Sequence, residues 1–534
     1  MISIDQNCHP LWDVVPKLQA LAAKGHHVTQ YIEDFDTAFT SMGSSVHAGA
    51  LHIERERYYR SGGADWGAAL FYSEFLGRQP VDIRRWEPYT GMKTDVLARH
   101  LGRSVDDLFD IYSPGDNWQL IGPSYAGDER HHRTIGDISW SEAADYLHQI
   151  VGIAREDFVR SFPGSKTLAD SLSVLDELAD NALYFNDELT EGKDDTLVAF
   201  YNRMLSLIPE VGQHATVDYG MYMDSLDAAH PLLRLFLTRY EQAAALYNQA
   251  IHETDLGLRP LETAQGELPF FGVMSHDGHE VRSTLYLQGD HVRLVDREWP
   301  IRDGRLTCDE DAPAELVAGK AILLVLQVRM GPDGDKLALP YHGSMYMPAS
   351  YRFQRLLTEA GLLEGPVNPI VRVRLRLLDR LRELDTVIHL PAHLAAAMGK
   401  EELPARELGE HWQDLQVDAR RRLESFKDPA SRQRWLLDAL PDVSAQIHAL
   451  DIRRRELAAV NEKDPELRDI WKHIKPLQQR QLQTLVQQID RDWQVRDIDY
   501  WDSRGAIWPW CLALGGEKFY KSIIDRAEVY EENA

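Results

Sequence analysis

The segment 320–374 constrains the fold of this chain more than any other part of the sequence. It opens with an almost wholly apolar run, which predicts a strand over 321–330 that is buried on both faces of a sheet. Gly331, Pro332 and Gly334 then break the chain, and a second apolar run follows them. This alternation of apolar runs and turn residues predicts buried strands joined by short connections.

A helix and a further strand follow in the same segment. Apolar side chains at helical spacing predict an amphipathic helix over 349–361, which ends at Gly361. A β-branched run then predicts a strand over 370–373. Strand, loop, helix and strand in this order are typical of a doubly wound α/β fold with a parallel sheet core.

The loop before this helix is the most site-like part of the sequence. It carries Tyr341, His342, Gly343, Ser344 and Tyr346. Ligands in such folds bind at the carboxyl ends of strands, and the free N–H groups at a helix start attract anions. We therefore expect these residues to bind a substrate, with Gly343 allowing close approach. The alternative is a capped helix start with packed tyrosines.

Three residues outside the loop are further candidates for substrate binding. Gln327 on the predicted buried strand needs a hydrogen-bond partner, which can be a substrate or a structural network. Asn368 and Arg372 begin the next predicted strand. That position is at the far end from the expected ligand crevice, unless the loop folds over.

Asp128, Glu129, His131 and His132 form the densest cluster of titratable residues, just after a strand predicted at 118–121. A histidine most easily supplies a base near neutral pH, and a neighbouring carboxylate can orient it. We therefore expect general-base chemistry from this cluster and from His342, unless the cluster is only an exposed charged loop.

Two further histidines, His276 and His279, flank Asp277 and Gly278. Asp-Gly is first of all a hairpin turn, and no other ligand pattern supports a metal site there, so none is expected. The turn belongs to a small antiparallel meander with strands predicted at 270–274, 281–287 and 292–295. The whole chain is then organised as follows: a mostly helical part with some of the α/β core at 1–260, the meander and the α/β unit at 261–400, and a helical coiled-coil arm with a return to the body at 401–534.

Charge and composition limit the partners. The net charge is −26, from 58 basic and 84 acidic residues, so nucleic acid and anionic membranes should be repelled. No apolar run reaches the length of a membrane span, and no charged-then-apolar leader follows Met1. The three cysteines lie far apart and form no motif. These features predict a cytoplasmic protein, and the predicted crevice at 341–346 suits a small-molecule substrate.

The order of elements in the second half resembles one family. The residues that carry the likeness are Leu268-Pro269-Phe270-Phe271 at the start of the meander, Gln327, Gly343-Ser344, a helix with Tyr351, a strand over 366–374, and a return at Gly516-Glu517-Lys518-Phe519-Tyr520. This pattern is similar to the BshC family, the cysteine-adding enzymes of bacillithiol biosynthesis. The first half lacks the Gly-Gln-Gln signature of that family. The sequence at 75–80 is the segment most similar to that signature.

The resemblance implies a Rossmann-like core, small connecting domains and a coiled-coil arm that forms a homodimer. It also implies a ligase that joins an amino acid, by analogy cysteine, to an amino-sugar-type amine, with a nucleotide as a possible cofactor. His131 or His132 would act as the base. Two alternatives stay open: a non-catalytic scaffold or assembly protein on the same fold, which the missing signature favours, and a nucleotide-dependent transferase with another acceptor.

Overall fold

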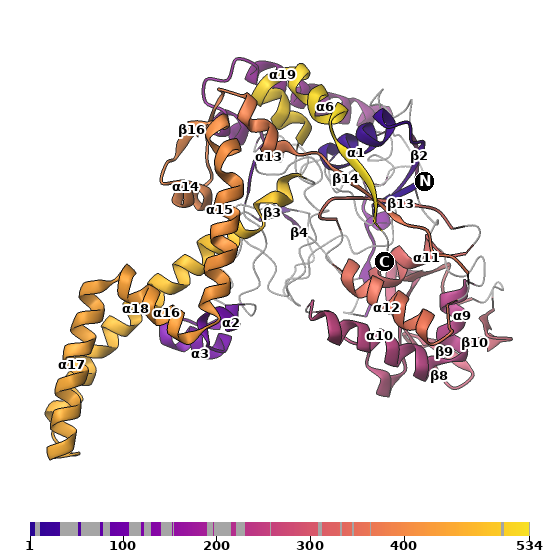
Figure 1. Ribbon diagram of the computed structural model, residues 1–534. Coiled ribbons are helices and arrows are strands. Elements are labelled where there is room, and N and C mark those ends of the chain that lie inside the picture. The colour runs from indigo at the N-terminus through magenta and orange to yellow at the C-terminus, as the bar shows by residue number, and fades with distance from the viewer. Residues whose placement is uncertain are drawn as a thin grey trace.

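The fold is a mixed α/β architecture with two large sheets, two small two-stranded sheets and long C-terminal helices (Figure 1). The computed structural model describes residues 1–5, 11–32, 52–54, 75–77, 86–105, 119–121, 130–139, 152, 154–188, 196, 205, 215–219, 230–256, 258–307, 312–331, 334–343, 346–363, 365–502 and 507–532.

A largely parallel sheet forms the centre of the molecule. Its strand order is β17-β14-β13-β1-β2-β6, and only the pairing of β14 with β17 is antiparallel. The strands come from the two ends of the chain as well as from its middle, so the sheet crosses all three predicted segments. Their bounds are β1 Ile2–Asp5, β2 Val28–Ile32, β6 Ala215–Tyr219, β13 Leu337–Pro340, β14 Ile370–Arg374 and β17 Glu528–Glu532.

The strand–helix–strand unit predicted in the middle of the chain is confirmed, although its first strand is β13. Strands β13 and β14 are parallel neighbours, with Ala338 opposite Val371, and α12 (Met347–Glu359) connects them. Alternation explains the burial of β13. Leu337 and Leu339 face one core and Ala338 faces the other, as expected for a strand covered on both sides.

The strand predicted over 321–330 is wrong, because this run forms helix α11 (Ala321–Gln327). The helix is buried on all sides. Leu324 and Val325 enter the core between the two sheets, whereas Leu323 and Leu326 enter the core under the antiparallel sheet. A helix that is buried all round shows no helical period in its sequence, so its apolar run looks the same as a buried strand.

The predicted meander is confirmed and belongs to a larger antiparallel sheet, with strand order β11-β10-β9-β8-β7-β12 and with β5 paired to β8. The β7–β8 turn uses left-handed backbone at Asp277 (φ 52°) and Gly278 (φ 83°), as an Asp-Gly hairpin requires. The bounds are β5 His132–Arg133, β7 Glu267–His276, β8 His279–Gln288, β9 His291–Leu294, β10 Arg297–Arg302, β11 Arg305–Leu306 and β12 Leu316–Gly319.

Helices α9 (Pro231–Thr238), α10 (Tyr240–Thr254) and α12 pack on the antiparallel sheet around an aromatic core. The Phe353 ring lies 5.5 Å from that of Tyr247 and 6.3 Å from that of Phe236, measured between centroids. A second core joins the two sheets. It contains Ile2, Ile4, Leu337 and Leu339 of the parallel sheet with Val273, Leu316 and Ala318 of the antiparallel sheet.

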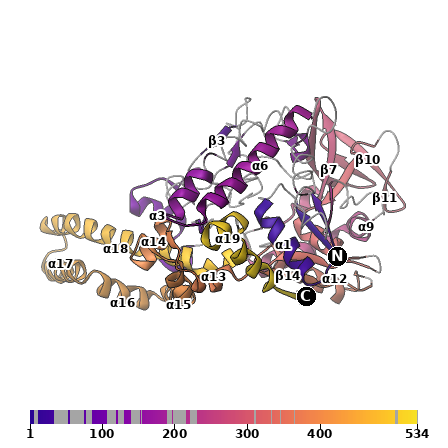
Figure 2. The same ribbon diagram turned by 90° about the horizontal axis from the view of Figure 1, so that it is seen from above.

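The opposite face of the parallel sheet packs on α1 (Leu11–Ala23) and α19 (Ile507–Asp525). Helix α6 (Leu168–Glu188) lies against α19, as both views show (Figures 1 and 2). The apolar, aromatic segment near the C-terminus therefore returns to the body of the molecule, as predicted.

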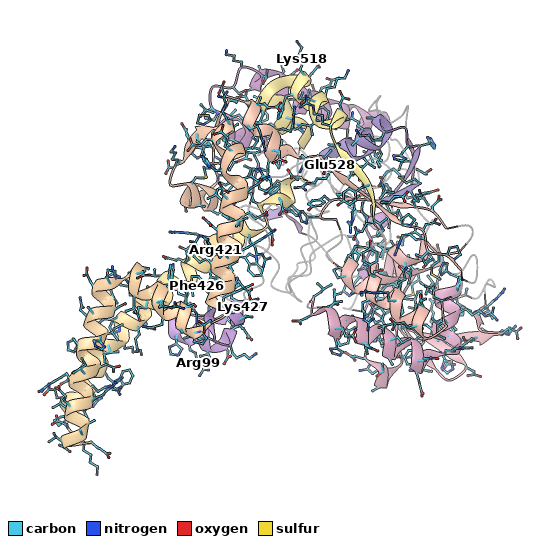
Figure 3. All side chains as sticks on the ribbon, viewed as in Figure 1. Arg99, Arg421, Phe426, Lys427, Lys518 and Glu528 are labelled. Atoms are coloured by element: carbon cyan, nitrogen blue, oxygen red, sulfur yellow. The ribbon has the colours of Figure 1, made fainter. Side chains whose placement is uncertain are left out.

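Four helices form the projecting C-terminal part: α15 (Ala405–Phe426), α16 (Pro429–Ala439), α17 (Pro441–Val460) and α18 (Glu466–Arg496). They extend away from the body in both ribbon views (Figures 1 and 2). Helix α18 packs along α15 and α17. Phe426, at the end of α15, packs near α2 (Glu87–Thr90) and α3 (Thr94–Leu101), where Figure 3 also labels Arg99.

Shorter elements complete the described part of the chain. None of the helices described there is both long and apolar enough to cross a membrane. The remaining elements are β3 His52–Glu54, β4 Gln119–Ile121, η3 Ile135–Asp137, η4 Thr263–Gln265, α13 Leu377–Arg380, η5 Leu381–Glu383, β15 Val387–His389, α14 Ala392–Met398, β16 Glu402–Pro404 and η6 Ile498–Asp502.

Replacing Phe353 with Ala should destabilise the core between α12 and the antiparallel sheet. The ring is fully buried, and its removal leaves a cavity between Phe236 and Tyr247, so we expect a loss of about 3–5 kcal/mol in unfolding free energy. Urea unfolding of this variant and of Val460→Ala, an exposed control on α17, measures the difference. Equal curves for the two variants would contradict the assigned packing.

Candidate functional site

The candidate site lies at the carboxyl end of β13, where the strand order of the parallel sheet changes direction. From β1 the chain adds β2 and β6 on one side of the sheet, and it later adds β13, β14 and β17 on the other. Ligands of open α/β sheets bind outside the carboxyl ends of strands at such a point. The loop with Tyr341, His342 and Gly343 follows β13 here.

His342 faces a carboxylate from a distant part of the chain. Its Nε2 lies 3.3 Å from Oδ2 of Asp499, within ion-pair distance but not aligned as a hydrogen bond. The other carboxylate oxygen of Asp499 accepts a 2.7 Å hydrogen bond from Gln416 Nε2, and Arg420 Nη2 lies 3.6 Å from it. Asp499 is thus fixed by two side chains of α15 while it faces the imidazole.

Burial alone would raise the pKa of Asp499, but its contact with His342 and the positive charge of Arg420 bring this pKa below the ordinary value for an aspartate. Asp499 is therefore charged at neutral pH. A charged carboxylate beside an imidazole stabilises the protonated imidazolium and orients the ring. His342 and Asp499 thus have the chemistry of a general base whose ring is oriented by a carboxylate.

Tyr341 forms an aromatic wall beside His342. Its ring centroid lies 4.4 Å from the guanidinium carbon of Arg374 and 4.4 Å from the centroid of the His342 ring, which stands edge-on to it. Arg374 ends β14 and donates a 3.0 Å hydrogen bond from Nη2 to Asp502 Oδ2. Cation–π stacking and this ion pair fix Tyr341 at the strand ends.

Asp502 is fully buried next to the site. Its Oδ1 accepts a 3.0 Å hydrogen bond from the Leu378 N–H, and its Oδ2 accepts from Arg374. Burial raises the pKa of Asp502 to about 6, although both donors act in the opposite direction. The site therefore includes one carboxyl group, Asp499, with a low pKa and another, Asp502, with a high pKa.

Arg372 holds the loop through its backbone carbonyls. Its Nη1 donates to the carbonyls of Pro340 (3.1 Å) and Gly343 (2.9 Å), and its Nε donates to Glu532. The prediction placed Arg372 at the far end of its strand from the ligand loop, and the structure corrects this. Because β13 has only four residues, Arg372 pairs with Leu339, one residue before the end of that strand.

The hydrogen bonds given for Asn368 and Tyr346 are not to the loop that carries His342. Asn368 donates a 2.6 Å hydrogen bond from Nδ2 to the Gly334 carbonyl. Gly334 precedes β13 and Asn368 precedes β14, so this contact is at the amino ends of the two strands. Tyr346 is the N-cap residue of α12, and its carbonyl accepts a 3.1 Å hydrogen bond from the Ser350 N–H. Both contacts are structural.

Gln327 is on helix α11 rather than on a strand, and it is buried near Gly319. Its backbone carbonyl accepts a hydrogen bond from the His230 side chain. Burial lowers the pKa of His230 to about 4, and this hydrogen bond opposes the shift. His230 also accepts from the Leu232 N–H and so caps α9. The described surroundings of Gln327 are those of a junction between helices.

His132 begins β5, which pairs with β8 of the antiparallel sheet, and His131 directly precedes that strand. His131 stacks on His276 with centroids 3.7 Å apart and an angle of 5°. Burial, aided by the charge of Arg282, lowers the pKa of His132 to about 4. Among the described strands, β4, which was predicted just before the cluster, pairs with β3 in a separate two-stranded sheet, so the expected strand-end setting in the parallel sheet is wrong.

Three predicted site residues, Asp128, Glu129 and Ser344, lie outside the described residues. At the β7–β8 turn, Nδ1 of His279 lies 3.0 Å from Oδ2 of Asp137. Among the residues described by the structure, no group of three or more His, Cys, Asp or Glu side chains is arranged to hold a metal ion.

Sequence reasoning missed Asp499, Asp502, Arg374 and Gln416 as members of the site. Asp499 and Asp502 come after the long helices, in η6, and nothing in their local sequence points to His342. Arg374 lies in an arginine-rich stretch at 372–382, and nothing in that stretch points to Tyr341. Comparison with protein-family models and with curated proteins gives no match.

Asp502→Asn should remove a pH dependence from the stability of the chain. The pKa of Asp502 is raised from 3.8 to about 6, so its protonation stabilises the folded state. This contribution is complete below the unfolded pKa and is lost as pH rises through the folded pKa. We expect wild type to lose roughly 2 kcal/mol relative to the Asn variant between pH 4.5 and pH 7.5, because part of the contribution is already lost at pH 4.5.

Denaturant unfolding of both proteins at pH 4.5 and pH 7.5 measures this difference. A constant difference in free energy between wild type and variant at the two pH values would show that Asp502 titrates as an ordinary aspartate.

Proposed function

We propose that the parallel sheet is a Rossmann-like core. When its six strands are numbered in chain order, from β1 to β17, their order across the sheet is 3-2-1-4-5-6. This is the strand order of dinucleotide-binding sheets, here with an antiparallel last strand. The order supports a ligand site between β1 and β13, where the His342 loop lies.

On this core we propose a ligase that forms a carbon–nitrogen bond. By resemblance to the BshC family, the substrates are an amino acid, cysteine by analogy, and an amino-sugar-type amine. A nucleoside triphosphate is the third substrate: the amino-acid carboxylate attacks its γ- or α-phosphorus, which breaks a phosphoanhydride bond and releases the nucleoside diphosphate or pyrophosphate, and an acyl phosphate or acyl nucleotide forms. The amine attacks this acyl carbon, the carbon–nitrogen bond forms, and the bond from the acyl carbon to the phosphate oxygen breaks.

One observation carries this proposal: His342 lies at the carboxyl end of β13 against a charged, fixed carboxylate. The attacking amine must lose a proton, and His342 is the group proposed to accept it. Asp499 stabilises the imidazolium that results. The Tyr341 ring borders the imidazole, and the Arg374 guanidinium packs on that ring, so Tyr341 can exclude water from one side of His342.

The role of base is assigned to His342 and not to His131 or His132. A base with a pKa near 4, such as His132, is a weak proton acceptor at neutral pH. His131 is stacked face to face on His276.

Replacing His342 with Ala should reduce formation of the conjugate by about 10²–10⁴-fold, because the amine then loses its general base. The melting temperature should change little, because His342 is about one-third exposed. The assay mixes the purified chain with cysteine, glucosamine-type amines and ATP, and mass spectrometry follows the amide product. His448→Ala, at an exposed position on α17, is the matched control.

Ligand-dependent thermal shifts provide the second measurement. Any substrate that binds the folded chain raises its melting temperature by mass action. If wild type forms no conjugate and none of the nucleotides, amino acids or amino sugars raises this temperature, the ligase proposal fails and the non-catalytic scaffold becomes the better assignment.

A further inference from the structure

The C-terminal strand β17 is joined to the sheet by more than its backbone. Each of its three glutamates forms an ion pair with a basic side chain of the parallel-sheet region. Figure 3 labels Glu528, where the strand begins. The pairs are Glu528 with Arg376 (3.1 Å), Glu531 with Lys336, and Glu532 with Arg372.

Only the Glu532 pair reaches the candidate site. Arg372 is 5% exposed, and the same guanidinium that pairs with Glu532 donates from Nη1 to the carbonyls of Pro340 and Gly343. These two carbonyls flank Tyr341 and His342. The Glu531 pair with Lys336 is half-exposed and lies before β13, at its amino end.

Asp499 and Arg374 contact the side chains of the loop around His342, whereas its backbone is held by hydrogen bonds. The Gly343 N–H donates to the Pro340 carbonyl (2.8 Å), and the Tyr341 N–H donates to the Val373 carbonyl (2.9 Å). The first bond closes the turn, and the second attaches the turn to β14. Arg372 adds a third constraint, since one nitrogen holds both ends of the turn.

A buried guanidinium needs a counter-charge to remain in place. Two carbonyl dipoles do not supply a full negative charge, and an uncompensated buried charge is strongly destabilising. The carboxylate of Glu532 supplies it and also orients the planar guanidinium, because the Nε and Nη1 donors are fixed relative to each other. The direction of Nη1, and with it the loop, therefore depends on a residue of the C-terminal strand.

We propose that Arg372 and Glu532 are positioning residues, through which the C-terminal strand holds the His342 loop in its working geometry. The catalytic consequence rests on the proposed function of His342. The geometric consequence, order in the turn from Pro340 to Gly343, does not. Two independent measurements can therefore separate the two.

The test compares Glu532→Gln and Arg372→Lys with Glu531→Gln. The control removes one carboxylate from the same strand but leaves Arg372 untouched. In Arg372→Lys the positive charge remains, yet a single ammonium cannot reproduce the planar fork, so this variant separates loop geometry from loss of charge. Hydrogen exchange at the Tyr341 and Gly343 amides and NMR titration of the His342 ring measure the loop without any substrate.

We expect both test variants to speed exchange at these two amides by roughly 10-fold or more and to move the His342 titration, with the control unchanged. In the ligase assay kcat should fall by about 10–100-fold, with a smaller change in KM. A misplaced base reduces the stabilisation of the transition state more than it reduces the affinity for the substrate.

The outcomes are distinct. Unchanged exchange and an unchanged His342 titration in both test variants would overturn the positioning role, whatever the activity. Faster exchange in all three variants, control included, would also overturn it, because it would show a general loosening of β17. If the loop responds as expected while wild type makes no conjugate, the positioning role stands and only the ligase function fails.

Discussion

The parallel pairing of β13 with β1 on one side and β14 on the other is the interaction on which the rest of the structure depends. It joins the first residues of the chain to a segment more than three hundred positions later, with Ile2 opposite Leu337. Strands this short have few ladder hydrogen bonds, so their stability comes from burial on both faces. Ala338 enters one core and Leu337 and Leu339 enter the other, and this second core also holds the antiparallel sheet in place.

The same pairing explains why charged side chains gather where the strands end. Arg372 and Arg374 are carried by β14, and their carboxylate partners come from β17 and η6. Removing such charges from water costs several kcal/mol per ion, and apolar pairs of similar volume are often as stable or more stable. Stability alone therefore does not account for these pairs. Each of them instead fixes a part of the His342 loop or of its aromatic neighbour.

The sequence predicted the fold correctly where a segment has periodic apolar residues or a typical turn sequence. The helix after the His342 loop, strand β14 and the Asp-Gly hairpin could be predicted because amphipathic spacing and turn residues are local signals. Helix α11 could not be predicted, because a segment between two cores is apolar at nearly every position. His131 and His132 were attributed to the wrong setting for a different reason. The pairing of β5 with β8 is a long-range contact, and the local sequence of neither strand indicates it.

Long-range contacts also order the site, and several of them lie at the base of the projecting helices. The Arg496 carbonyl, at the end of α18, accepts hydrogen bonds from Gln416 and from Arg420 on α15, each 3.0 Å long. The same two side chains contact Asp499. The two helices are thus fastened to each other at the point where Asp499 meets His342. Because both partners of the imidazole loop, Asp499 and Arg372, are carried by regular elements rather than by loops, the geometry at His342 is set by the packing of the whole body.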